Sequence, residues 1–260
     1  MKAQLLAALL MLTTGLSLAQ AGERCGEDSN RVCNQFVSRF EMLKRLNAIE
    51  GDMDQAQEDL ALIESINGQT RSGLENTTEN FLYVLNMIGG STKTSEAQRA
   101  FNIIASKVEA RQSLYKVTTV FGELYRTEGD VEQTIEDLNL ITAAAKNGLG
   151  LREATNQFLT ILQTVGGSTK TSEAQRIFGF LLEDSIATSS SALTRAFNAV
   201  YSAEGDIDQT LEDLELIRKA AKKCGSLEIA TQDFLDVLRE SGGSTKTSEA
   251  QRLYQNLYAL

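Results

Sequence analysis

Acidic side chains cluster at three places along the chain, and grouped carboxylates are the ligands that a hard cation such as calcium prefers. The first cluster holds Asp52, Asp54, Glu58 and Asp59. The twelve-residue calcium loop with a central glycine and a final glutamate is absent. Acidic residues also favour the first turn of a helix because they complement its dipole, so we expect surface carboxylates and predict no metal ligand. The matching clusters are Asp130, Glu132, Glu136, Asp137 and Asp206, Asp208, Glu212, Asp213.

An eleven-residue segment, GGSTKTSEAQR, occurs identically at 89–99, 166–176 and 242–252. Between the preceding Gly-Asp pair and this segment, the second and third copies agree at only 18 of 37 positions. One interpretation is a tight helix–helix turn, with glycines for unusual backbone angles and hydroxyls for capping. A second is a weak anion site of helix-start amides and Lys93. A third is a surface for recognition or phosphorylation, whose candidate residues are Ser91, Thr92, Lys93, Thr94, Ser168, Thr169, Lys170, Thr171, Ser244, Thr245, Lys246 and Thr247.

Catalytic chemistry has little basis in this composition. The chain has no histidine, which removes the commonest general base and metal ligand. The nucleophile motif G-x-S-x-G is absent, and the phosphate-binding pattern G-x-x-x-x-G-K-[ST] fails because no glycine precedes Lys93. We therefore predict a protein that is not an enzyme, with no catalytic residue and no cofactor.

Helix signals surround each copy of the segment. A Gly-Asp pair begins at Gly51, Gly129 and Gly205, with a glutamine three residues after each aspartate, as in a capping box. The apolar residues that follow recur at helical spacing, and Ser95 with Gln98 suggests a further capping box. Both landmarks recur every 76 to 78 residues. The pattern predicts an all-α fold of three tandem helical repeats, forming bundles or a short solenoid.

The repeat boundaries follow from these landmarks. After Ser95 no stop signal occurs before the next Gly-Asp, which leaves open one long helix over 95–128 or two shorter ones. The last copy has only eight residues after Arg252, so we expect a truncated final helix that caps the array. The predicted divisions are a signal peptide over 1–21, repeats over 22–99, 100–176 and 177–252, and the capping helix over 253–260.

The first 21 residues have the features of an export signal. Lys2 precedes the apolar run 5–12, and Ala19-Gln20-Ala21 supplies an A-x-A cleavage site. We therefore predict a secreted protein, or a periplasmic one in a bacterium, and no membrane span. In an oxidising compartment the three cysteines allow three disulfide pairings. Of these we expect the local Cys25–Cys33 bond, which leaves Cys224 inert or free to cross-link chains. Asn76-Thr77-Thr78 is a glycosylation sequon.

Charge further limits the function. Removal of residues 1–21 takes away Lys2 and changes the formal charge from −10 to −11, so nucleic acid and anionic membranes are poor partners. The leading hypothesis is an extracellular structural or interaction protein that presents one loop three times to a protein partner, or self-associates through Cys224. One alternative is a carrier of an apolar ligand between amphipathic helices. Another is an acidic, calcium-associated extracellular protein.

Overall fold

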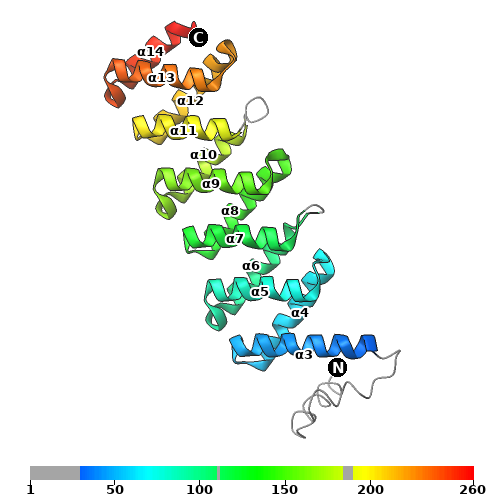
Figure 1. Cartoon of the computed structure of the whole chain (residues 1–260). Helices are drawn as coiled ribbons and strands as arrows, with labels where there is room; N and C mark the ends of the chain where they lie inside the picture. The colour runs from blue at the N-terminus through cyan, green and yellow to red at the C-terminus, as the bar shows by residue number, and fades with distance from the viewer. Residues whose placement is uncertain (1–29, 110–111, 184–189) are drawn as a thin grey trace. The chain divides into compact units, whose positions relative to one another are not determined.

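The computed structural model describes residues 30–109, 112–183 and 190–260, with side chains from Ser38 onward. This part of the chain is all-α, as predicted, and contains no strand. The predicted signal peptide and Cys25 lie outside it, as does the side chain of Cys33. The chain divides into two compact units, Met1–Arg99 and Ala100–Leu260, and Figure 1 labels the helices of each unit.

From residue 30 onward, the first unit contains three helices, a short turn of 3-10 helix and the start of a fourth helix. Helix α4 packs against α3 and α5, and the turn η2 contacts both of these outer helices. Leu46, Ile63 and Phe81 are fully buried in its core. The elements are α3 (Asn30–Glu50), α4 (Met53–Thr70), α5 (Leu74–Ile88), η2 (Gly90–Lys93) and the beginning of α6 (Thr94–Ser106).

The second unit contains the same succession of three helices, a 3-10 turn and a fourth helix around each of its two segments. Helix α11 packs against both α9 and α13, so these three helices lie side by side (Figure 1). The elements are α7 (Leu114–Glu128), α8 (Val131–Ala144), the π-helical turn η3 (Ala145–Leu149), α9 (Leu151–Val165), η4 (Gly167–Lys170), α10 (Thr171–Glu183), α11 (Ser190–Glu204), α12 (Ile207–Cys224), α13 (Leu227–Ser241), η5 (Gly243–Lys246) and α14 (Thr247–Tyr258).

The predicted helix starts at the Gly-Asp pairs are confirmed. Asp130 has an extended backbone, and its carboxylate accepts a hydrogen bond from the backbone N–H of Gln133, as an N-cap does. Gly129 ends α7 in a left-handed conformation. The same caps stand at Gly51-Asp52 and Gly205-Asp206.

The fourth helix of each copy is α6, α10 or α14, and the structure bears on two expectations about them: the open choice between one helix and two after Ser95, and the truncated last helix. Helix α6 ends at Ser106 and α7 begins at Leu114, so the region left open after Ser95 contains two helices. Helix α14 has 12 residues against 13 in α6 and in α10. Residues 253–258 are therefore the second half of a helix of nearly full length.

Candidate functional site

The last aspartate of each acidic cluster is buried in the described structure. Asp59, Asp137 and Asp213 have no exposed surface, so the expectation of surface carboxylates is wrong for these three. Each is the seventh residue of its helix, at the end of the second turn, on the stripe that faces the core. In α4, for example, Asp59 shares this stripe with Ala56, Leu60 and Ile63.

A glutamine side chain of the repeated segment donates a hydrogen bond to each buried aspartate. Gln98 Nε2 donates to Asp59 Oδ1 at 2.7 Å, across 39 residues of sequence. Gln55 Nε2 donates to the same oxygen at 3.3 Å. The capping box predicted at Ser95 and Gln98 is wrong, because α6 already begins at Thr94 and the Gln98 amide reaches the core carboxylate. The equivalent bonds are Gln175 to Asp137 (2.8 Å) and Gln251 to Asp213 (2.7 Å).

A threonine of the same segment holds the glutamate that ends the first helix of each copy. Thr94 Oγ1 donates to Glu50 Oε2 at 2.7 Å and is buried. Its hydroxyl also lies 3.3 Å from the Ser91 carbonyl oxygen. Thr94 was a candidate for a surface contact, but its hydroxyl faces inward and joins the turn to α3. Thr171 with Glu128 and Thr247 with Glu204 repeat the contact, each at 2.7 Å.

The glutamate and aspartate of each copy form a carboxyl pair beneath the turn. Glu50 and Asp59 interact electrostatically, and Glu50 Oε1 and Asp59 Oδ2 are both buried without a hydrogen-bond partner. Because two carboxylates can hydrogen-bond to each other only when one carries a proton, a proton shared by the pair would satisfy both oxygens. The same two oxygens are without donors in Glu128 and Asp137, and in Glu204 and Asp213.

Burial is the main reason that these aspartates favour the protonated form. It raises the pKa of Asp59 to about 6, against the donor bond from Gln98, and the charge of Glu50 adds to the rise. Burial likewise raises the pKa of Asp137 to about 7, with a smaller contribution from Glu128. The pKa of Asp213 also rises to about 7, mainly through burial.

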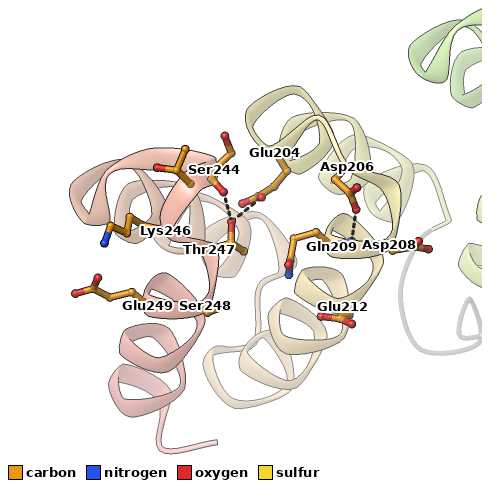
Figure 2. A pocket seen from close by; sticks show the side chains of 11 residues that line it. Glu204, Asp206, Asp208, Gln209, Glu212, Ser244, Lys246, Thr247, Ser248 and Glu249 are labelled. Atoms are coloured by element: carbon orange, nitrogen blue, oxygen red, sulfur yellow. Dashed lines mark hydrogen bonds between the residues drawn. The ribbon is translucent and has the colours of Figure 1, made fainter.

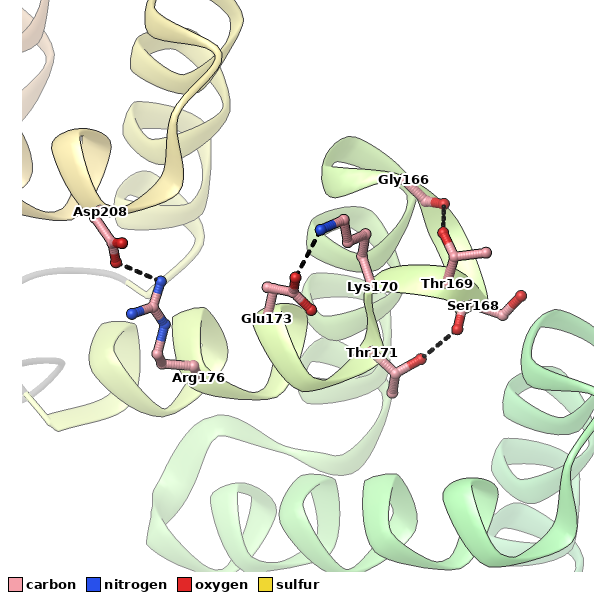
Figure 3. Close-up of polar contacts among 8 residues, drawn as sticks. All are labelled: Gly166, Ser168, Thr169, Lys170, Thr171, Glu173, Arg176 and Asp208. Atoms are coloured by element: carbon pink, nitrogen blue, oxygen red, sulfur yellow. Dashed lines mark hydrogen bonds and ion pairs between the residues drawn. The ribbon is translucent and has the colours of Figure 1, made fainter.

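The outer half of the segment forms an exposed turn (Figure 3). In the second copy Thr169 Oγ1 donates to the Gly166 carbonyl at 3.2 Å, and Lys170 forms an ion pair with Glu173 at 2.7 Å. Gly166 has a φ of +128°, and a Cβ there would lie 3.2 Å from Lys170 Cγ. The chain therefore requires glycine at this position. The three residues before the buried threonine, such as Ser168, Thr169 and Lys170, are exposed in every copy.

Polar grooves lie beside the turn in the first and third copies. The third-copy groove has a volume of about 640 Å³ and runs between the start of α12 and η5 (Figure 2). Its walls carry the carboxylates of Glu204, Asp206 and Asp208 and the side chain of Lys246. The first-copy groove, about 330 Å³, has the equivalent residues Glu50, Asp52 and 91–96 as its lining. Both grooves are lined by polar side chains and give the expected apolar-ligand carrier no support.

The remaining predicted residues lie away from this site. Asn76 is exposed in the first turn of α5, and the sequon residue Thr78 is buried behind it. Cys224 is a free, exposed thiol at the end of α12. Among the described residues, no three His, Cys, Asp or Glu side chains are grouped so that they could hold a metal ion. No described helix is both long enough and apolar enough to cross a membrane.

Helical spacing was the signal that could have found the buried pair. Asp59 follows Ala56 by three residues and precedes Ile63 by four, which places it on the apolar stripe. The glutamate before each Gly-Asp is also common to all three copies, at Glu50, Glu128 and Glu204. Together these positions form the pattern E-G-D-x-x-Q-x-x-E-D-L.

Comparison with known proteins adds no functional information. The chain matches no protein family, no curated protein and no solved structure.

Proposed function

We propose that the chain is an exported, non-enzymatic interaction protein whose repeated turn contacts a protein partner. The supporting observation is that the fold explains only half of the identical segment. The buried hydroxyl of Thr94 and the amide of Gln98 hold the carboxyl pair, so their identity follows from packing. Ser91 and Ser95 are exposed, and in the described structure neither side chain forms a hydrogen bond that holds the turn. Their identity in all three copies is what recognition by a partner would require.

The chemistry of the surface favours a polar, basic partner. The turn offers hydroxyls, and its lysine is already paired with a glutamate in the first two copies. Carboxylates dominate the adjoining third-copy groove, which carries Glu204, Asp206, Asp208, Glu212 and Glu249 against the single cation Lys246. A lysine- or arginine-rich segment would complement this charge. Display of three copies on one chain would raise the avidity for a partner that also repeats.

Calorimetric titration with a synthetic lysine–glycine peptide tests the proposal. The expected result is saturable binding that weakens as salt is added, because the contact is between exposed charges. Replacement of Ser91, Ser168 and Ser244 by arginine should abolish binding, since it adds bulk and positive charge at each turn. The matched control replaces the exposed Ser106, Thr160 and Ser202, which lie on other helices, by arginine. Equal binding by the two triple variants would contradict a role for the turn.

A further inference from the structure

Helix α14 carries an apolar face that its counterpart α10 buries. Both helices begin with the sequence Thr-Ser-Glu-Ala-Gln-Arg, so their positions correspond one to one. Leu253 and Leu257 of α14 are 42% and 63% exposed. Ile177 and Leu181, at the same positions of α10, are 0% and 1% exposed. The two faces have the same chemistry, and in the described structure only that of α10 is covered.

The second unit shows what covers such a face. Helix α11, the first helix of the third copy, packs against both α9 and α10. Its residues Leu193 and Phe197 are fully buried. An ion pair across the same boundary joins Arg176 of α10 to Asp208 of α12 at 2.7 Å (Figure 3). The contact between consecutive copies thus includes an apolar helix face and an arginine–aspartate pair, beside the bonds of Ser190 to Gln157 and of Arg218 to the Phe180 carbonyl.

Helix α3 presents the complementary half of this contact. Counted back from the glutamates Glu50 and Glu204, Leu43 occupies the position of the buried Phe197 but is itself only half-buried. Phe40, one turn earlier, occupies the position of Thr194 and is also half-buried, whereas Arg39 occupies that of the buried Leu193. The aspartate that corresponds to Asp208 is Asp54, which is exposed. Helix α3, the first described helix, therefore corresponds to the α11 side of this contact. Helix α14, the last described helix, corresponds to the α10 side.

We propose that the chain associates head to tail with a second copy of itself. In this contact α14 of one copy packs on α3 of the next, as α10 packs against α11 within the chain. Leu253 and Leu257 meet Phe40 and Leu43, while Arg252 takes the place of Arg176 and pairs with Asp54 of the neighbour. The apolar faces and the opposite charges both identify the occupant as another copy. Because the two surfaces differ, the contact is heterologous and generates a filament or a closed ring.

Sedimentation velocity of the full secreted chain, in reductant so that Cys224 cannot cross-link, tests the proposal. The expected result is a concentration-dependent series of oligomers. Leu257→Arg should shift the association midpoint to at least tenfold higher concentration, whereas Tyr115→Arg, at an exposed site on α7, should leave it unchanged. Arg252→Glu and Asp54→Arg should each weaken association, and the chain that carries both substitutions should recover it.

Recovery in the double charge variant is the result that fixes the geometry. Oligomers that Leu257→Arg weakens but the double variant fails to restore would indicate a face-to-face dimer through α14 and would overturn the proposal. A wild-type chain that remains monomeric at every concentration would also overturn it. Circular dichroism of each variant excludes loss of fold as the cause. The test is independent of the proposed function, because the peptide titration probes the turn and not the outer face of α14.

Discussion

Both halves of the repeated segment are identical in all three copies, but the inner half faces the core and the outer half faces solvent. On the inner half Thr171, Ala174 and Gln175 face the core, where two of them hold Glu128 and Asp137. On the outer half Ser168 and Lys170 face solvent. Packing alone is enough to constrain the inner residues, because each loss would strand a buried carboxyl oxygen. Among the outer residues the fold constrains Gly166 through its backbone conformation and Thr169 through its bond to the Gly166 carbonyl, but it does not constrain Ser168. The comparison therefore separates what the fold requires from what a partner would require.

The largest effect expected on the inner half is a dependence of the free energy of unfolding on pH, which arises from its buried carboxyl groups. The pKa of Asp137 is raised to about 7 from an ordinary value of 3.8. Glu128, Gln133 and Gln175 face it, and no cation among the described residues contributes to the shift. The folded chain therefore binds more protons than the unfolded chain between about pH 4 and 7, and the free energy of unfolding falls as pH rises through this range. Each carboxyl contributes at most about 1.4 kcal/mol per pH unit.

Urea unfolding at a series of pH values measures this dependence. Replacement of Asp59, Asp137 and Asp213 together by asparagine should flatten the pH dependence. The asparagine amide does not titrate, and it supplies a permanent donor to the neighbouring glutamate. A pH dependence as steep in the triple variant as in the wild type would show that the pairs do not share a proton.

The next largest effect should follow from Gln175→Leu. This change removes the amide that donates to Asp137 Oδ1 at 2.8 Å and leaves a buried carboxyl group short of a donor. We expect the free energy of unfolding at neutral pH to fall by about 2–3 kcal/mol. Gln163→Leu, at an exposed position of α9, is the control and should change it by less than about 0.5 kcal/mol. Equal effects of the two substitutions would mean that the inner half does not stabilise the fold.

A smaller effect is expected from Thr171→Val, which keeps the shape of the side chain. It removes the hydroxyl that donates to Glu128 Oε2 at 2.7 Å. The free energy of unfolding should fall by about 1 kcal/mol, as measured by urea denaturation. Thr160→Val, whose exposed hydroxyl bonds only to its own helix backbone, should have little effect, and a larger loss there than at Thr171 would contradict the assignment.

The smallest effect should come from the outer half. Lys170→Ala removes an exposed ion pair with Glu173, and such pairs contribute little to stability. We expect no measurable shift of the urea midpoint. A clear shift would place Lys170 with the structural residues of the segment.

Much of the fold could be predicted because its signals are local. Gly129 and Asp130 mark a helix boundary through backbone angles and one capping bond, and both lie next to each other in sequence. The carboxyl pair was missed for the opposite reason. Asp137 meets Gln175 from 38 residues away, and an acidic residue near a helix start is equally well explained by the helix dipole. Its position on the apolar stripe was the evidence that distinguished the two.

The outer face of α14 shows a similar limit. Leu253 and Leu257 lie at helical core spacing, which is typical of residues that pack inward. Whether a face is covered depends on which helix follows it, and spacing within one helix carries no information on that.

The identity of the three segments also has a consequence for folding. Each segment must find its own glutamate and aspartate, although any of the three would fit. The correct threonine lies 43 or 44 residues from its glutamate, whereas Thr247 lies almost 200 residues from Glu50. Loop-closure entropy favours the shorter tether by only about 1.3 kcal/mol. Refolding at high concentration should therefore populate swapped species, in which the segment of one chain docks on the carboxyl pair of another.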